Sequence, residues 1–328
     1  MHIAVTGGAG FIGGHLAERF VRSGHDVVVL DSLSPFYDVR IKEHTVEHCR
    51  GLTTETDGTY TFIDGDVRDP AAVERALQDA DVVYHQAAQA GVRQSVDEPR
   101  RYDEINVDGT LNVLDEARAQ DVQRVVYASS SSVYGKPTSL PYSESQPTRP
   151  VSPYGASKLA GERYACAYSD VYDLPAVALR YFTVYGTRMR PNMAISNFVS
   201  RCLDGKPPII YGDGSQTRDF TYIDDVVRAN ESLLETDAAD GEALNIGSTD
   251  NIDIRTLAAE IRDVLAPDLE LTYANRHAAD AEHTHADTTK ARELLDYEPT
   301  YSIREGVDAF VEWYRENRDW YEPLVLAS

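Results

Sequence analysis

Lysine is scarce in this chain: only Lys42, Lys136, Lys158, Lys206 and Lys290 occur among 328 residues. Lysine and arginine together number 31 against 54 acidic residues, which gives a formal net charge of −23. So negative a chain repels the phosphate backbone of nucleic acids, so nucleic acid is excluded as a partner. An acidic, lysine-poor composition is typical of a protein kept soluble in concentrated salt. An ordinary acidic enzyme of the cytosol remains the alternative.

Cysteine is also rare, and long apolar runs are absent. Cys49, Cys166 and Cys202 are odd in number and widely spaced, which fits neither a disulfide framework nor a zinc motif. No run approaches the ~18 apolar residues of a membrane span. The chain enters a strand pattern at His2 without a basic stretch and apolar core before it, which argues against a signal peptide. We therefore expect a cytoplasmic, reducing location without membrane association.

Short apolar runs alternate with amphipathic stretches in the first half of the chain. The runs predict strands at 2–6, 26–30, 61–63, 82–85, 124–128 and 176–181, and the stretches predict helices at 11–22, 71–78, 102–119 and 154–169. This alternation is typical of an α/β fold with a doubly wound parallel sheet covered on both faces. We predict domains at 1–183 and 184–328, the second a smaller α/β domain for the substrate. Segment 219–250 is left open as a return to the first domain.

A glycine-rich loop follows the first predicted strand. Residues 6–13 read Thr-Gly-Gly-Ala-Gly-Phe-Ile-Gly, so Gly7, Gly10 and Gly13 frame the start of the first helix together with Phe11 and Ile12. Such glycines allow a tight turn and close approach of the backbone to a pyrophosphate at a helix N-terminus. The loop predicts a Rossmann domain that binds a dinucleotide.

The end of the second predicted strand indicates which dinucleotide is bound. Asp31 stands there, where a carboxylate can accept hydrogen bonds from the adenosine ribose hydroxyls. The same carboxylate would repel a 2′-phosphate, so NAD is favoured over NADP.

A tyrosine and a lysine share one face of a predicted helix. Tyr154 and Lys158 are at positions i and i+4. A phenol with a pKa near 10 is a poor base at neutral pH, and a nearby ammonium favours its phenolate form. The serine-rich run 129–132 ends a preceding strand. After a dinucleotide loop, this combination favours a catalytic pair over a core tyrosine beside a solvated lysine.

With these motifs, the sequence resembles the extended short-chain dehydrogenase/reductases of the nucleotide-sugar epimerase/dehydratase family. The matching segments are 6–13, 66–67, 85–88, 129–135, 154–158, 180–186 and 218–225, and they cover nearly the whole chain. The resemblance implies a Rossmann domain, a smaller sugar-nucleotide domain and a homodimer built on two helices. Here those helices would be residues 102–119 and 154–172.

The resemblance also implies roles for individual residues. Tyr154 resembles the general base and Lys158 the residue that binds the nicotinamide ribose, while Ser130 corresponds to the hydroxyl that contacts the reacting sugar. The remaining cofactor positions are two pairs, the adenine contacts Asp66 and Val67 and the close wall formed by Ala87 and Ala88.

Substrate contacts implied by the resemblance lie mostly in the second half of the chain. Arg218 resembles the arginine that grips the diphosphate, and Asp280 resembles the acid that holds the uridine ribose, with Arg276 as a phosphate neighbour. Ala278 and Ala279 depart from the Pro-Gly of the family pattern, which puts the alignment of Asp280 in doubt. Thr183 stands where galactose-type epimerases often carry asparagine.

Three histidines raise a metal alternative. His277, His283 and His285 lack the i, i+4 spacing of a helical zinc pair, and the implied redox chemistry needs no metal. We expect none.

The implied activity is NAD-dependent 4-epimerisation of a UDP-sugar through a 4-keto intermediate. Related dehydratases and decarboxylases usually carry an acid where this chain has Ser131 and Ser132, which disfavours them. A dehydrogenase that releases reduced cofactor and a non-catalytic NAD-binding regulator are further alternatives.

The choice of sugar stays open between UDP-glucuronate and UDP-glucose. Residues 89–93 and 188–194 resemble the UDP-glucuronate 4-epimerase branch more than the UDP-galactose branch. Ser131 and Ser132 could hold the C5 carboxylate of a hexuronate, with Arg190 as a further candidate. Alternatively, these serines cap the strand and bind water.

The charge of −23 makes a prediction about salt. Thermal stability and activity should rise as salt approaches molar concentration, because screening relieves repulsion among surface carboxylates. Melting temperatures between low and molar KCl test this, and a melting temperature indifferent to salt would contradict salt adaptation.

Overall fold

The computed structural model describes residues 1–136, 139–248, 250–275 and 282–326. Its centre is a seven-stranded sheet in the order β11-β6-β5-β4-β1-β2-β3, with every neighbouring pair parallel. The strands are β1 (His2–Thr6), β2 (Asp26–Asp31), β3 (Thr59–Asp64), β4 (Val82–His85), β5 (Arg124–Ser130), β6 (Ala176–Tyr181) and β11 (Ala243–Ile246). The predicted doubly wound parallel sheet is thereby confirmed, with β2, β3 and β5 slightly longer than expected.

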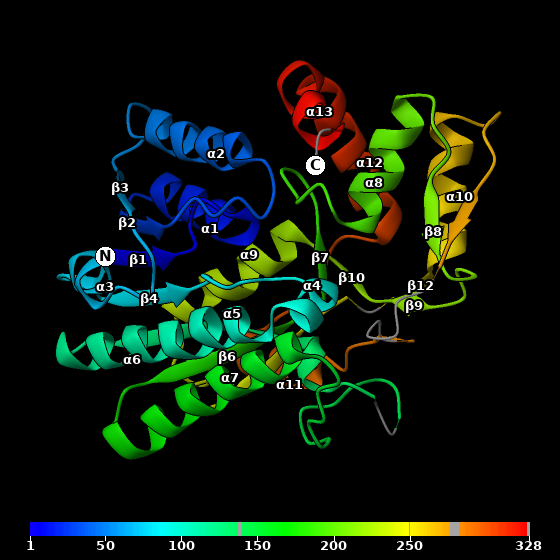
Figure 1. Ribbon diagram of the computed structural model, residues 1–328. Helices are drawn as coiled ribbons and strands as arrows, with labels where there is room; N and C mark the ends of the chain where they lie inside the picture. The colour runs from blue at the N-terminus through cyan, green and yellow to red at the C-terminus, as the bar shows by residue number, and fades with distance from the viewer. Residues whose placement is uncertain (137–138, 249, 276–281, 327–328) are drawn as a thin grey trace.

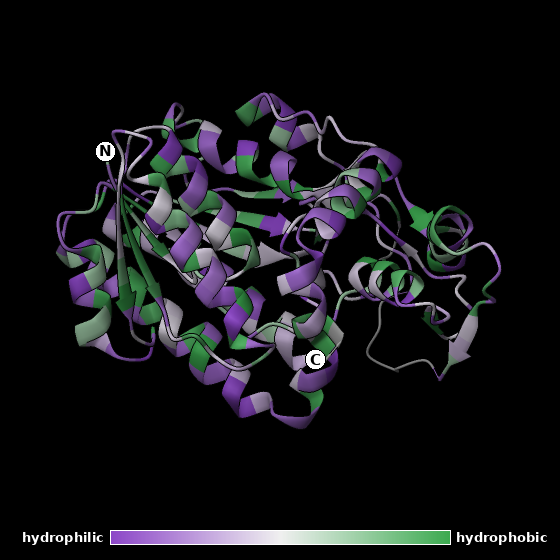
Figure 2. Cartoon of the chain, turned by 90° about the horizontal axis from the view of Figure 1, so that it is seen from above, coloured by the Kyte–Doolittle hydropathy of each residue, from purple (hydrophilic) through white to green (hydrophobic). Residues whose placement is uncertain are grey.

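Helices cover both faces of this sheet (Figure 1). One face carries α1 (Phe11–Arg22), α2 (Val39–Leu52) and α9 (Ile223–Glu231), and the other carries α3 (Pro70–Leu77), α6 (Gly109–Ala119) and α7 (Pro153–Tyr172). Side chains alternate along β1: Ile3 and Val5 join the core beneath α1, while Ala4 joins the core beneath α6. Because both faces of the inner strands are buried, these strands are largely apolar, and several of them are green in Figure 2, whereas the edge strand β3 alternates between exposed and half-buried residues.

The helix α7 carries the predicted tyrosine and lysine. Ser152 caps it by accepting a hydrogen bond from the Gly155 amide at 3.0 Å, and Pro153 occupies the first helical turn. The helix ends at Asp173 in the left-handed conformation. It therefore starts one residue earlier and ends three residues later than the predicted 154–169.

A π-helical turn interrupts the predicted helix 102–119. The segment consists of α5 (Pro99–Asp103), the π-helical turn η1 (Glu104–Asp108) and α6. The extra residue of a π turn redirects side chains locally, and such turns are frequent at functional sites. Here the turn contains Asn106, which is buried.

A smaller lobe lies beyond the end of the sheet. It contains the strand pairs β7 (Thr183–Tyr185) with β10 (Phe220–Tyr222), β8 (Ile209–Tyr211) with β13 (Thr272–Ala274), and β9 (Thr217–Arg218) with β12 (Ile252–Asp253). Its helices are α8 (Ala194–Leu203), α10 (Ile254–Leu265), α12 (Ile303–Glu316) and α13 (Arg318–Leu326), and α11 (Thr289–Leu295) packs beside β11.

The chain returns from the smaller lobe to the central sheet. Both α9, which packs against α1, and β11, which pairs with β6, lie inside segment 219–250. The division at residues 183 and 184 stays a prediction.

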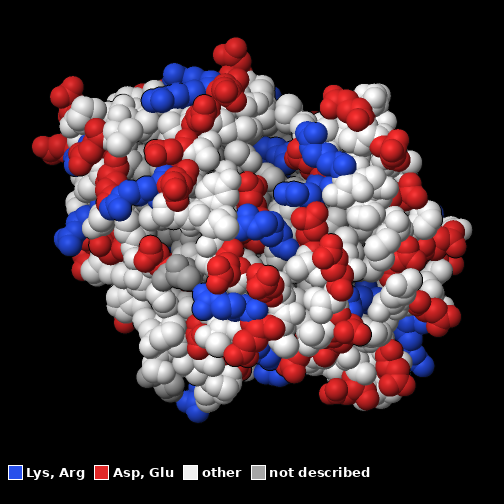
Figure 3. All heavy atoms as spheres, turned by 180° about the vertical axis from the view of Figure 1, so that it is seen from behind, with Lys and Arg blue, Asp and Glu red and all other residues white. Residues whose placement is uncertain are grey.

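Acidic side chains are spread over the face drawn in Figure 3, with basic side chains between them. Within the described residues, no helix is long and apolar enough to cross a lipid bilayer.

Candidate active site

A cavity of about 590 Å³ opens at the carboxyl ends of the central strands. Ligands of open α/β sheets bind at this edge. The structure brings most of the predicted site residues to its walls, namely Gly7, Gly10, Phe11, Ile12, Gly13, Asp31, Asp66, Val67, Ala87, Ala88, Ser130, Ser131, Ser132, Tyr154, Lys158, Thr183 and Arg190.

The glycine loop has the shape that a pyrophosphate requires. Gly7 has a φ of +72°, and a Cβ there would lie 2.6 Å from the amide nitrogen of Ala87. The loop and the Ala87–Ala88 wall therefore approach each other too closely for a side chain at position 7. Gly10 precedes α1 and places no side-chain cap on its first amides, which are left to receive an anion. These residues fit a dinucleotide.

Asp31 ends β2 at the cavity wall. Its carboxylate accepts hydrogen bonds from the amides of Ala9 at 3.1 Å and Leu33 at 2.9 Å, which fixes its position beside the glycine loop. Lys42 of α2 lies 3.8 Å from the same carboxylate and is buried, and this burial lowers the pKa of its ammonium. Sequence reasoning missed Lys42, although a lysine near the second strand of so lysine-poor a chain was an available signal.

Asp66 follows β3 and is already paired. Arg68 donates from Nε and Nη2 to the two carboxylate oxygens at 3.0 and 2.8 Å, and these bonds hold the pKa of Asp66 below its usual value. The neighbouring Val67 carbonyl accepts a hydrogen bond from Asn112 at 3.0 Å.

Tyr154 and Ser130 meet where α7 packs against the end of β5. A Cβ on Gly155 would lie 2.5 Å from the carbonyl oxygen of Ser132, so only glycine allows the helix this close to the turn Ser130–Ser132, called the serine turn below. Ser130 Oγ accepts a hydrogen bond from the Ser132 amide at 3.1 Å, and the Ser130 hydroxyl faces the Tyr154 phenol and acts to lower the pKa of that phenol.

Burial opposes charge on both members of the tyrosine–lysine pair. Desolvation raises the pKa of Tyr154, while its hydrogen bond with Ser130 and the positive charge of Arg190 act in the opposite direction. Desolvation also lowers the pKa of Lys158 to about 7. The phenolate therefore forms near neutral pH only when further positive charge lies close to it.

Positive charge gathers in this cavity despite the acidic chain. Five bases line it (Lys42, Arg68, Arg101, Lys158 and Arg190) against two acids (Asp31 and Asp66), which leaves a balance of +3. The chain as a whole carries −23. Such a concave basic region favours ligands that carry diphosphate groups.

Asn106 is a second residue that sequence reasoning missed. The π turn directs its side chain between the cavity-lining residue Gln89 and the helix α7: Oδ1 accepts from the Gln89 amide at 2.7 Å, and Nδ2 donates to Ser157 at 2.9 Å. Asn106 thus fixes the wall segment after Ala88 to the helix α7. No local sequence pattern indicates a π turn, so the spacing of residues alone could not identify Asn106 as part of the site.

The predicted uridine and diphosphate contacts have a different outcome. Arg218 is on β9, outside the cavity lining, where its Nη1 donates to the carbonyls of Thr217 at 2.8 Å and Glu282 at 3.3 Å. Arg276 and Asp280 lie outside the described residues.

The histidines of the metal alternative do not converge where they are described. His283 Nδ1 lies 3.0 Å from the Thr217 hydroxyl, and the carbonyl of His285 accepts from the Tyr142 amide at 2.7 Å. His277 is outside the described residues. Among the residues that the structure does describe, no three His, Cys, Asp or Glu side chains form a group that could hold a metal ion.

Fold and cavity together define a Rossmann-type protein with a tyrosine–lysine–serine centre. Comparison with known proteins identifies the family: residues 3–247 match the model of the NAD dependent epimerase/dehydratase family. The chain belongs to that family.

Relatives match over nearly their whole length. A putative UDP-glucose 4-epimerase of Methanocaldococcus jannaschii is 36% identical over 96% of this chain and 99% of its own. A UDP-glucuronate 4-epimerase of Thermodesulfobacterium geofontis is 35% identical over 95% and 96%. Among solved structures, UDP-glucuronic acid 4-epimerase from Bacillus cereus in complex with UDP-glucuronic acid and NAD superimposes with a TM-score of 0.88, at 36% identity over 96% and 99%.

The charges around Asp31 predict cofactor preference. NAD should bind far better than NADP, and Asp31→Ser should narrow the ratio of the two Kd values by about tenfold or more, because it removes the repulsive carboxylate. Lys42→Met is the matched variant, which removes a positive charge beside Asp31 instead of the negative one, and it should widen the ratio of the two Kd values. Calorimetry measures both, and equal binding of NAD and NADP to the wild type would contradict the assignment.

Proposed function

We propose that this protein is an NAD-dependent UDP-sugar 4-epimerase, which inverts C4 of the sugar through a 4-keto intermediate. The observation that carries the proposal is the meeting of Ser130, Tyr154 and Lys158 in the cavity that the glycine loop and Asp31 also line. The relatives support it, since the Bacillus cereus 4-epimerase was crystallised with NAD and a UDP-sugar.

Each residue of the centre has a chemical role in this proposal. Ser130 accepts and orients the C4 hydroxyl, and the Tyr154 phenolate removes its proton. NAD⁺, when bound, would accept the hydride from C4, and after the flat 4-keto sugar turns within the pocket the same hydride would be returned to its other face. Tyr154 then gives its proton back to the C4 oxygen. Lys158 holds the nicotinamide ribose and, when protonated, favours the phenolate.

The cofactor is held by the residues that already fit it. The glycine loop and the first turn of α1 receive the pyrophosphate, Asp31 the adenosine ribose, and Asp66 and Val67 the adenine. Ala87 and Ala88 form the opposite wall.

The alternatives within the family find less support in this cavity. Dehydration or decarboxylation needs an acid for later proton transfers, yet the positions that follow Ser130 are the hydroxyls Ser131 and Ser132. A non-catalytic regulator would have no need of the Tyr154 and Lys158 pair. Analysis of the products distinguishes the epimerase from a dehydrogenase that releases reduced cofactor.

We infer that the sugar is a hexuronate, UDP-glucuronate, with UDP-glucose as the second candidate. Ser131, Ser132 and Arg190 line the same cavity as Tyr154, so they can reach a C5 carboxylate while C4 reacts. Neutral hydroxyls hold such a carboxylate without protonating it. Thr183 lines the cavity as a further contact. Arg218, Arg276 and Asp280 remain our assignment for the UDP moiety.

We also propose a cytoplasmic, salt-adapted homodimer. Its interface would be formed by the helices 99–119 and 153–172. Apolar side chains on or near these helices are exposed in the single chain, with Val171 67% and Val96 55% exposed. A second copy that covers them would remove this surface from water.

Replacement of the base tests the activity. Tyr154→Phe should lower kcat by about 10²–10⁴-fold and leave NAD binding intact, because it removes the phenol but little volume. Product separation after incubation with UDP-glucuronate and UDP-glucose gives the rates. Near wild-type turnover by pure Tyr154→Phe protein would sink the assignment.

The serine turn tests the sugar. Ser131→Ala/Ser132→Ala should lower kcat/KM for UDP-glucuronate by about 10-fold or more and change that for UDP-glucose little, because only the uronate presents a carboxylate. The control is Ser143→Ala/Ser145→Ala. The hydroxyls of Ser143 and Ser145 are hydrogen-bonded to each other at 3.1 Å, and neither residue lines the cavity. A wild-type preference for UDP-glucose that the double mutant leaves unchanged would refute the carboxylate pocket.

A further inference from the structure

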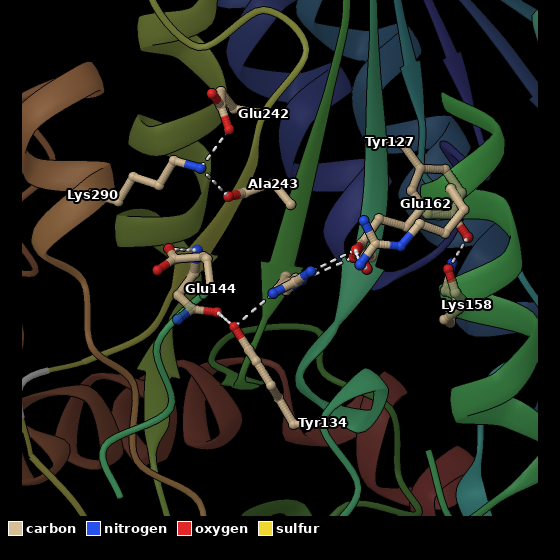
Figure 4. A network of polar contacts seen from close by, with 12 residues as sticks. Tyr127, Tyr134, Glu144, Lys158, Glu162, Glu242, Ala243 and Lys290 are labelled. Carbon is tan, nitrogen blue, oxygen red and sulfur yellow. Dashed lines mark hydrogen bonds and ion pairs between the residues drawn. The ribbon is translucent and has the colours of Figure 1, made fainter. Parts of the chain in front are cut away.

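A buried ion pair lies directly behind the serine turn. Glu162 of α7 and Arg180 of β6 form two parallel hydrogen bonds, Nε to Oε2 at 2.9 Å and Nη2 to Oε1 at 2.6 Å. Their side chains are 0% and 2% exposed. Burying such a pair carries a desolvation penalty that apolar residues would avoid, so stability alone gives little reason for it. Figure 4 shows the contacts that run from Glu162 toward Tyr134.

Both ends of the serine turn are attached to this one pair. Ser129, immediately before the turn, donates to Glu162 Oε2 at 2.7 Å. Tyr134, two residues after it, accepts from Arg180 Nη1 at 2.8 Å. The Tyr134 hydroxyl in turn donates to Asn245 Oδ1 at 2.6 Å, which ties the arrangement to β11. Only residues 130–133 lie between the two attachment points.

The pair also belongs to the catalytic helix. Glu162 follows Lys158 by one helical turn and Tyr154 by two, so all three share a face of α7. The carbonyl of Ser132 touches the first turn of the same helix at Gly155. This one ion pair therefore connects the end of strand β5, the serine turn and the helix α7, which carries Tyr154, and fixes their relative positions.

We propose that Glu162 and Arg180 are positioning residues that hold the turn Ser130–Ser132 in register with Tyr154, and so keep a substrate carboxylate clamped while C4 is a ketone. The proposal rests on the proposed function. Ser130 meets the reacting hydroxyl and Ser131 and Ser132 meet the carboxylate, so one displaced turn would disturb both.

A loosened turn would have a chemical signature. In the 4-keto form of a hexuronate, the carboxylate carbon C6 is attached to C5, which lies next to the C4 ketone. If the C5–C6 bond breaks, CO₂ leaves and the bond's electron pair forms the enolate of C4 and C5. Protonation at C5 then gives a UDP-4-keto-pentose. A tight serine turn disfavours this loss because it fixes the carboxylate away from the geometry in which the breaking bond overlaps the carbonyl.

The decisive variant is Tyr134→Phe, which keeps the ring and removes one attachment of the turn. Its matched control is Tyr142→Phe: the Tyr142 ring stacks on Tyr134 with centroids 4.5 Å apart, but its hydroxyl donates to the backbone carbonyls of Gly135 and His283. Arg180→Lys is a second variant, which keeps the charge and loses the fork.

With UDP-glucuronate and NAD, Tyr134→Phe should lower kcat by about tenfold with a smaller change in KM, because the reacting geometry is disturbed more than binding. The decarboxylated fraction of product should rise by about tenfold, and Arg180→Lys should exceed both effects. Tyr142→Phe should match the wild type, and melting temperatures show whether the two phenylalanine variants are equally stable. Equal kcat and equal product ratios for Tyr134→Phe and Tyr142→Phe would overturn the proposal.

A measurement independent of turnover separates this proposal from the proposed function. In protein labelled with ¹³C at tyrosine Cζ, the Tyr154 resonance is assigned by its loss in Tyr154→Phe. Its pH titration should move to higher pH in Tyr134→Phe and stay unchanged in Tyr142→Phe, because a displaced turn takes the Ser130 hydroxyl, which favours the phenolate, away from the Tyr154 phenol. A wild type that epimerises neither sugar would refute the proposed function. An unmoved Tyr154 titration in Tyr134→Phe would refute the positioning role whatever the activity.

Discussion

The parallel alignment of the central strands is the constraint on which this protein depends. Thr6 and His85, the last residues of β1 and β4, stand side by side in the sheet, and Tyr127 stands beside His85, three residues before β5 ends at Ser130, so the three strands run toward the same edge. The residues that follow each strand therefore lie at that edge of the sheet. The glycine loop, the Ala87–Ala88 wall and the serine turn are therefore neighbours in space although they are far apart in sequence. Helix α7, pressed against β5, adds the phenol and the ammonium.

The charge of the cavity differs in sign from the net charge of the chain. The surface of the protein is acidic, while the cavity holds an excess of bases around Asp31 and Asp66. The excess of bases thus favours diphosphate ligands in the cavity, although the chain as a whole is strongly negative. Inside the cavity, burial works against charge on Tyr154 and Lys158. Their reactivity therefore depends on neighbours such as Arg190, and it is a property of the assembled site.

The sequence was most informative where function depends on short spacing. The glycine loop, Asp31 and the Tyr154–Lys158 pair are local patterns, and six central strands followed from their β-branched runs. Helix α2 escaped prediction because charged residues interrupt its apolar positions, and only the cap at Asp38, which accepts from the Arg40 amide at 3.0 Å, marks its start. Strand β11 (Ala243–Ile246) was missed because Asn245 interrupts its short apolar run and Ile246 is its one β-branched residue. The contacts of Asn106 with Ser157 and of Glu162 with Arg180 join separate elements of the fold, so no local sequence pattern indicates them, whereas Lys42 lies close enough in sequence to Asp31 to have been noticed.

The return of the chain through α9 and β11 has a consequence for how such a protein can be divided. A chain cut after β7 would lack β11, and β6 would then form the edge of the sheet. That strand is buried along its whole length and apolar except for Arg180, so its open hydrogen-bonding groups would recruit other chains. The smaller lobe is consequently not a terminal block that recombination could exchange at one junction. Any chimera that borrows a foreign lobe has to preserve residues 223–246 as part of the host, with a splice on either side of them.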